Sequence, residues 1–261
     1  MSCPAVAAGW LGAKMGRYRI DPRHLYLTGV SMSGGGVVPY LHLHDRVPCV
    51  PEVFGFDEMG REILAHLPGE VVDVDESRLT TGQLRSLVEW TRRFHREVAG
   101  FRSDGPWRMP PIADATVTAH NDIPPYNVCF EGDELVGVFD WDLAGPSTPL
   151  LELAFIAWNC VPLWRDMGAE VAAARLHVIA ETYGHYSALD ILVAVPGRIT
   201  RMLEWTPLAA ATGDEGIARL LAAGNEPEQS RVALDALQQR IPAIVLAGNA
   251  AGWAGPTSSA G

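Results

Sequence analysis

Two stretches of this sequence decide the expected fold: "HNDIPPYN" at residues 120–127 and "VFDWD" at residues 138–142. The first follows a short strand-like run, 116–119, and carries its polar residues into a proline-rich loop. The second overlaps the end of a run rich in apolar residues, 135–139. We expect this run to form a hairpin with residues 128–130 around a turn at 131–133. Polar side chains placed where strands end are held rigidly, so the pattern predicts a site with fixed geometry.

The residue types in these stretches fit phosphoryl transfer. That reaction needs one carboxylate to orient and deprotonate the accepting hydroxyl, and an amide with a second carboxylate to hold Mg²⁺ on the nucleotide phosphates. Asp122, Asn127 and Asp140 are residues of these types. Asp142 is a further carboxylate, two residues after Asp140.

Together the two stretches resemble the catalytic loop and metal-binding segment of the aminoglycoside phosphotransferase and choline kinase-like family, which is related to protein kinases. The family pattern is H-x-D-x-x-x-x-N, then a strand, then an aspartate, as in "HNDIPPYN" and "FDWDLAGPSTPLLELA" here. The resemblance implies Asp122 as catalytic base, His120 as a scaffold of the loop, and Asn127 and Asp140 as Mg²⁺ ligands. ATP or GTP is the implied co-substrate, and the acceptor is a small hydroxylated, neutral or cationic molecule.

The sequence around this core predicts an α+β, protein-kinase-like fold with two lobes and a reduced or atypical N-lobe. Residues 47–70 read as two strands joined by a turn near Asp57–Gly60, and the resemblance places Ala65, His66 and Leu67 in a hinge against the adenine. A helix follows from residue 79 to near Gly100. After the short strands, the expected helices cover about 150–160, 168–183, 188–206, 213–223 and 227–246.

The expected organisation has four parts: an atypical N-terminal segment (1–46), the remaining N-lobe strands and hinge (47–70), a helical catalytic C-lobe (71–246) and a flexible tail (247–261). Within the C-lobe, His95 is expected to be a packed, hydrogen-bonded helix residue and Trp141 a packing residue. Glu152 occupies a position where the family often has Asp, and a structural role is favoured for it. The resemblance covers about residues 47–246.

A competing motif lies in the N-terminal segment: "LYLTGVSMSGGG" at residues 25–36 is similar to the nucleophile elbow of α/β-hydrolases, with Ser31 as nucleophile. Too few residues precede it for the strands of that fold, so a hydrolase is the less favoured interpretation.

The same glycines could instead form a phosphate-binding loop of the kinase type, but the residues around them depart from the kinase pattern. The only lysine, Lys14, precedes the glycines, and the first glutamate is Glu52. Arg17, Arg19 or Arg23 are the possible substitutes. A catalytically weak or inactive kinase-like protein is therefore the alternative to an active phosphotransferase.

The composition sets wider limits. The formal net charge of −11 disfavours nucleic acid as a partner, and no segment has the length and apolarity of a membrane span. Four scattered cysteines indicate neither a zinc site nor a disulfide framework and fit a cytoplasmic location. The acceptor itself and the oligomeric state are left open. Several carboxylates of the C-lobe helices could attract a polycation, although helix-surface carboxylates are more often simply solvated. They are Asp166, Glu170, Glu181, Asp190, Glu204, Asp214 and Glu215.

Overall fold

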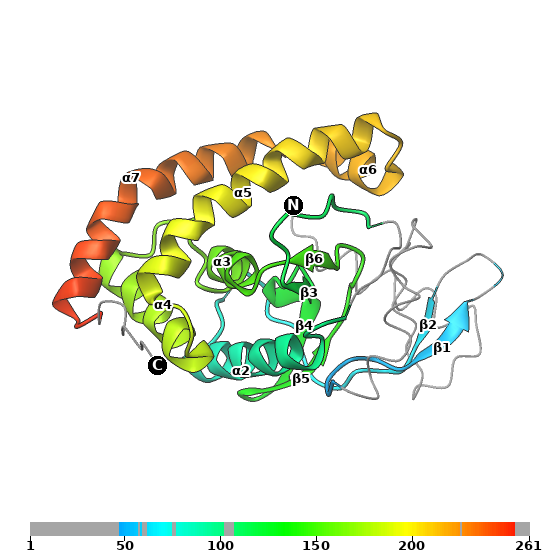
Figure 1. The fold of residues 1–261 in the computed structure, drawn as a ribbon, viewed down its shortest axis with the longest axis horizontal. Helices are drawn as coiled ribbons and strands as arrows, with labels where there is room; N and C mark the ends of the chain where they lie inside the picture. Colours follow the sequence, from blue (N-terminus) through cyan, green and yellow to red (C-terminus); the bar gives the residue numbers. More distant parts are fainter. Residues whose placement is uncertain are drawn as a thin grey trace.

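A computed structural model describes residues 47–56, 58, 62–74, 77–101, 107–224 and 226–253 of the chain. Figure 1 shows a helical body with short β-elements against it and one β-hairpin at the end of the molecule. That hairpin pairs β1 (Val53–Phe56) antiparallel with β2 (Glu62–Leu64), as the sequence predicts for residues 47–70. The motif "LYLTGVSMSGGG", Ser31 and Lys14 lie outside the described residues.

Two further strand pairs lie against the helices, and the sequence predicts only the first of them in full. Strand β4 (Val128–Glu131) forms an antiparallel hairpin with β5 (Glu134–Val138), which confirms the predicted turn. Strand β3 (Val117–Ala119) pairs with β6 (Gly145–Ser147), an element that the sequence analysis missed. The sequence of β6 is Gly-Pro-Ser, whose residues are all poor strand formers, so only its pairing with β3 makes it a strand.

The first helix of the body is α2 (Thr81–Glu97), and its start is fixed by a capping box. Thr80 Oγ1 accepts from the Gln83 amide, while the Gln83 side chain accepts from the Thr80 amide. The apolar stripe buries Leu84, Leu87 and Phe94 in the core. Helix α3 (Pro149–Cys160) is buried on almost every side, in agreement with its nearly continuous apolar sequence.

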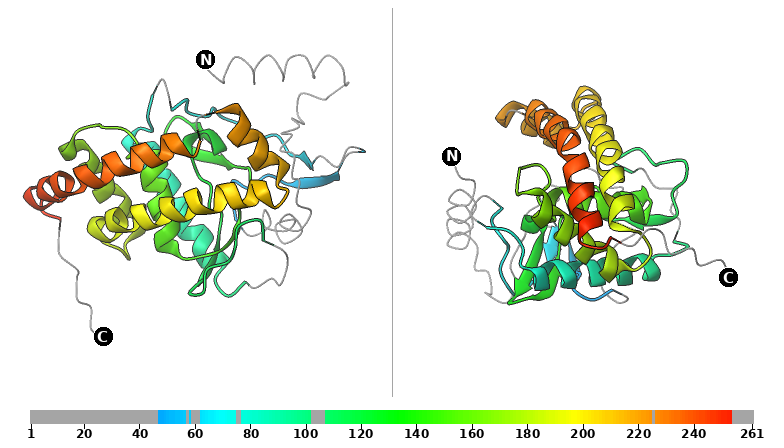
Figure 2. Two further views of the ribbon diagram at one scale, coloured as in Figure 1. Left: turned by 90° about the horizontal axis from the view of Figure 1, so that it is seen from above. Right: turned by 90° about the vertical axis from the view of Figure 1, so that its left-hand side faces the viewer.

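The remaining helices complete the body. They are α4 (Ala169–Tyr183), α5 (Ala188–Ala211), α6 (Glu215–Ala223) and α7 (Glu228–Ala250). Figures 1 and 2 show α5 and α7 along one side of the molecule, with α2 and the β4–β5 hairpin on the opposite side and α3 between them. None of the described helices is long and apolar enough to cross a membrane.

Two predicted boundaries were wrong. Helix α5 continues to Ala211 although Pro207 lies inside it, because a proline within a helix removes one hydrogen bond without preventing the helix from continuing. The predicted start of the flexible tail at residue 247 is also wrong, because α7 continues to Ala250. Trp253 then folds back against Gly248, and its indole donates to the Ala173 carbonyl at 3.3 Å. Residues 254–261 lie outside the described part.

Candidate active site

The two strand pairs bring the predicted site residues together. Val128 is opposite Val138 in the β4–β5 hairpin, and the Phe139 amide donates to the Asn127 carbonyl at 3.1 Å. Asn127 and Asp140 therefore stand at the same end of the hairpin. In the other pair, Ala119 is opposite Gly145, so the loop that begins at His120 lies beside the segment that follows Asp140.

The loop is held over this junction by His120, which is fully buried. Its Nε2 lies 3.0 Å from the Phe139 carbonyl oxygen, and its Nδ1 lies 3.3 Å from the Asp122 amide nitrogen. Burial lowers the pKa of His120, so the ring is neutral at pH 7, with Nε2 donating and Nδ1 accepting. Its ring also packs on Trp141, with centroids 4.3 Å apart. These contacts are those of a scaffold residue.

Asp122 is the one carboxylate of the loop at residues 120–127, and its surroundings disfavour its ionisation. Burial and, next, the negative charge of Asp140 raise its pKa to about 7, while the positive charge of Arg198 acts in the opposite direction. Asn127 donates through Nδ2 to the Asp122 carbonyl oxygen at 3.2 Å and to its carboxylate at 3.4 Å. A carboxyl group with a pKa near neutrality is well matched to general base catalysis at that pH.

Asp140 follows β5 and has a backbone φ of 63°, in the left-handed region that Asp and Asn tolerate better than most residues. Its side chain is exposed. The repulsion between Asp140 and Asp122 is the kind that a divalent cation relieves. Asn127 leaves its amide oxygen, the atom that binds hard cations, outside its contacts with Asp122.

The chemistry of these oxygen donors fits a hard cation such as Mg²⁺. The described residues contain no cluster of three or more His, Cys, Asp or Glu side chains that could enclose a metal ion. Mg²⁺ does not need such a cage when it is held by one or two carboxylates together with substrate phosphates. Asn127 and Asp140 meet that requirement.

The loop is supported from behind by Glu152 of α3, which is fully buried. Its Oε1 accepts from the Asn121 amide at 2.8 Å, and its Oε2 lies 2.5 Å from His95 Nε2. Burial alone would raise the pKa of Glu152, but the hydrogen bond and charge of His95 outweigh it and lower the pKa. His95 Nδ1 in turn lies 2.9 Å from the Tyr183 hydroxyl. The expected structural roles of His95 and Glu152 agree with these contacts.

Trp141 has the packing role that was expected for it. Its ring lies edge-on to Phe94 and tilted to Trp90, with centroid distances of 5.4 and 6.2 Å. The contact with His120 extends this aromatic group to the loop. Trp141 therefore joins helix α2 to the site.

Two arginines near the site were not predicted. Arg198 of α5 is buried, donates to the Asn121 carbonyl at 2.7 Å and stacks over Phe155, with 4.3 Å from its guanidinium carbon to the ring centroid. Burial lowers its pKa to about 10, which still leaves it charged. A signal was present in the sequence, because Arg198 falls on the apolar stripe of its helix between Val195 and Ile199, both fully buried.

Arg108 connects the site to helix α6. It forms a bidentate pair with Asp214 at 2.8 and 2.9 Å and donates to Asp142 at 3.0 Å. The hydrogen bonds between Arg108 and Asp214 raise the pKa of the guanidinium and lower that of the carboxyl group, which also caps α6 by accepting from the Ile217 amide. The local sequence gives no signal for Arg108, because its partners lie far along the chain.

The structure shows the path of the predicted hinge segment. Glu70 and Phe130 exchange backbone hydrogen bonds of 2.9 Å each, and the side chain of Leu67 lies against Gly137 of β5. The segment thus runs along the hairpin whose end carries Asn127 and Asp140. Ala65 is half-buried and His66 is exposed. The adenine contact of Ala65, His66 and Leu67 stays a prediction.

Comparisons with known proteins agree with this fold. Residues 106–185 match the model of the phosphotransferase enzyme family, APH. The structure of APH(2'')-IIa in a ternary complex with streptomycin and ATP is similar with a TM-score of 0.50, at 13% identity, over 92% of this chain and 97% of that one. Amicoumacin kinase hAmiN, in complex with AMP-PNP, Ca²⁺ and Ami, has a TM-score of 0.51 at 13% identity, over 92% and 96% of the two chains.

A curated relative is the trifolitoxin immunity protein of Rhizobium leguminosarum bv. trifolii, 32% identical over 145 residues. The match spans 50% of this chain and about half (54%) of that relative. The chain therefore has an α+β, protein-kinase-like fold. Its resemblance to aminoglycoside phosphotransferases is confirmed by the match of residues 106–185 and by the similar fold.

Proposed function

We propose that this protein transfers the γ-phosphoryl group of ATP or GTP to a hydroxyl group of a small molecule. The observation that carries the proposal is the meeting of Asp122, Asn127 and Asp140 at one end of the β4–β5 hairpin, with Asp122 electrostatically coupled to Asp140. The match of residues 106–185 to a phosphotransferase family supports it. So does the similarity in fold to APH(2'')-IIa, whose ternary complex contains streptomycin and ATP.

Each residue has a role in this proposal. Asp122 accepts the proton of the acceptor hydroxyl, and Asn127 orients it through the contact with its carboxylate. Asn127 and Asp140 would hold Mg²⁺, which neutralises charge on the phosphates when it is bound. His120 joins the Asp122 loop to Phe139, the neighbour of Asp140, so that base and metal ligand keep a fixed separation.

The alternative is a kinase-like protein with weak or no catalysis. The observation that favours it is the order of residues 1–52, in which the only lysine precedes the glycines and the first glutamate is Glu52. The usual lysine–glutamate pair that clamps the phosphates does not arise from this order. A cytoplasmic location and the choice between ATP and GTP also stay predictions.

The proposed function predicts a specific pH profile. Because Asp122 must be ionised to accept a proton, kcat/KM for nucleotide consumption should rise between pH 5 and pH 8. Its midpoint should lie at or below the metal-free pKa of about 7, because Mg²⁺ at Asp140 offsets the negative charge that helps to raise this pKa. The measurement is release of ADP or GDP at saturating Mg²⁺ with a panel of hydroxylated acceptors, with ³¹P NMR to identify the phosphorylated product. A flat profile across this range would contradict the role of Asp122. The absence of any Mg²⁺-dependent nucleoside diphosphate release would favour the inactive alternative.

A further inference from the structure

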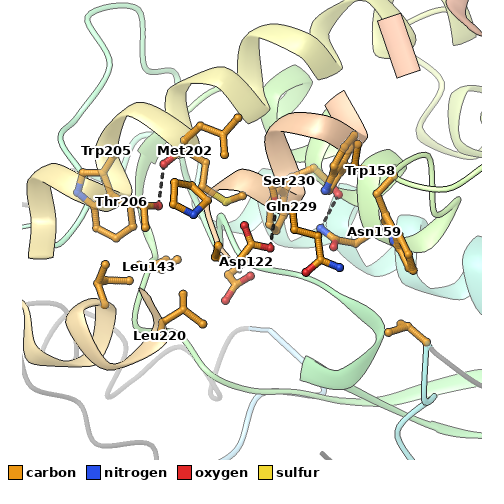
Figure 3. Close-up of a pocket in the computed structure, with 18 of the residues that line it drawn as sticks. Asp122, Leu143, Trp158, Asn159, Met202, Trp205, Thr206, Leu220, Gln229 and Ser230 are labelled. Atoms are coloured by element: carbon orange, nitrogen blue, oxygen red, sulfur yellow. Dashed lines mark hydrogen bonds between the residues drawn. The ribbon is translucent and has the colours of Figure 1, made fainter. Parts of the chain in front are cut away.

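A cavity of about 370 Å³ opens beside Asp122, between helices α3, α5, α6 and the start of α7. Figure 3 shows Asp122 among the side chains that line it. Its volume is at the lower end of the range for small-molecule sites. A hydroxyl group bound in this cavity can approach the proposed base, so under the proposed function the cavity is the acceptor site.

The walls of the cavity are mainly apolar and aromatic. Its aromatic residues come from the Asp122 loop, from α3 and the turn after it, and from α5: Tyr126, Phe155, Trp158, Trp164 and Trp205. Side chains of this kind bind flat apolar rings and also attract a single cation through their faces. They do not supply the many hydrogen-bond acceptors that a polyhydroxylated polycation needs.

Carboxylates are scarce among the lining residues that the structure describes: Asp122 and Glu226 are the acids. Glu226 Oε1 accepts a hydrogen bond from Ser230 of α7 at 2.9 Å, which holds the Glu226 carboxylate in place. None of the seven helix carboxylates considered in the sequence lines this cavity, and Asp214 is already paired with Arg108. Within the described lining, Glu226 is therefore the one acidic group besides the base.

The cavity extends to both sides of Asp122. In Figure 3, Trp205 lies at one end with Leu143 and Leu220, and Trp158 lies at the other, near Asn159. Asp122 lies between these ends in this view. A ligand that fills the site thus places its reacting hydroxyl in its middle, with apolar groups extending in both directions.

We propose that the acceptor is an elongated molecule with an internal hydroxyl group, an aromatic or aliphatic ring system, and at most one positive charge, which Glu226 binds. Only the phosphorylation of the hydroxyl group rests on the proposed function. The binding preference follows from the cavity alone. Polycationic aminoglycosides should bind this site poorly, because the described lining residues offer them one carboxylate besides the base.

Calorimetric titration with three probes tests the proposal. Propranolol carries a secondary hydroxyl between a naphthyl ring and one amine, its neutral diol analogue replaces that amine by a hydroxyl, and kanamycin is a polycation. We expect propranolol to bind at least about tenfold more tightly than kanamycin. In Glu226→Gln, propranolol should lose about tenfold in affinity while the diol analogue keeps its affinity. Glu204→Gln, which removes an exposed carboxylate of α5 outside the cavity, is the matched control.

Three results would overturn this acceptor class: tighter binding of kanamycin, no binding of either naphthyl probe, or equal losses in Glu226→Gln and Glu204→Gln. Titration of the same protein with Mg·ATP separates the two proposals. Binding of propranolol without binding of Mg·ATP would retain the ligand class and contradict the phosphotransferase. Binding of Mg·ATP together with a preference for kanamycin over propranolol would support the phosphotransferase and contradict the ligand class.

Discussion

Replacement of Asp122 by Asn is expected to lower kcat by about 10²–10⁴-fold while the dissociation constant of Mg·nucleotide changes by less than about threefold. The amide keeps the size of the side chain and can still accept from Asn127 Nδ2, but it cannot take a proton from the acceptor. The measurement is nucleoside diphosphate release with the best acceptor of the panel, beside calorimetric titration of the nucleotide.

The same variant should be more stable than the wild type, which separates catalysis from folding. Asp122 has a folded-state pKa of about 7, above the ordinary carboxyl value, so the native state holds its proton more tightly than the unfolded chain does. The stability that this proton gives is therefore lost as the pH rises from about 4 to 7, and the ionised group destabilises the fold above that window. Asn removes this cost, and we expect a gain of about 1–2 kcal/mol at pH 8, after allowance for partial exposure.

Chemical denaturation of both proteins at pH 5 and pH 8 gives this difference. The gain should be larger at pH 8, where the wild-type carboxyl group is charged. Wild-type turnover in the variant, or a loss of stability at pH 8 together with the loss of turnover, would contradict the assignment of Asp122 as a strained general base.

The second large effect is expected at Glu152. Glu152→Ala should lower the free energy of unfolding by about 3–5 kcal/mol, because it leaves His95 and the Asn121 amide buried without their partner. Loss of the Asn121 contact should also loosen the loop and lower kcat. Urea unfolding at pH 7 measures the first effect.

The matched control is Glu181→Ala, which removes a carboxylate paired with Arg85 at 3.3 Å on the surface. Exposed pairs of this kind contribute about 0–1 kcal/mol. The lowered pKa of Glu152 gives a second criterion: its stabilisation is present above the ordinary carboxyl pKa and disappears as the pH falls through the lower folded-state value. Equal losses in Glu152→Ala and Glu181→Ala would contradict a supporting role for the buried pair.

Much of the site could be predicted because its order in the chain reflects its geometry. A hairpin returns the chain to its starting point, so Asn127 before β4 and Asp140 after β5 must meet. The His-x-Asp spacing then allows His120 to accept from the Asp122 amide within the same turn. These contacts are local, and the sequence spacing is enough to indicate them.

Contacts between distant segments could not be predicted in this way. Arg108 and Asp214 are separated by more than a hundred residues, and neither lies in a recognisable pattern. The strand β6 exists through its pairing with β3, and Trp253 reaches Ala173 only after α4 and α7 are packed together. The acceptor cavity likewise needs the packing of several helices, so its aromatic walls were not foreseen.

The central claim is that Asp140, with Asn127, holds Mg·nucleotide next to Asp122, and calorimetric titration of wild type and Asp140→Asn with Mg·ATP tests it most directly. Asn suits the left-handed backbone at residue 140 and removes only the charge, while Asp235→Asn, on the exposed face of α7, is the control. We predict a wild-type dissociation constant between about 1 μM and 1 mM, weakened about 10–100-fold in Asp140→Asn and by EDTA, and unchanged in Asp235→Asn. No binding by the wild type, or wild-type affinity in Asp140→Asn, would contradict the account.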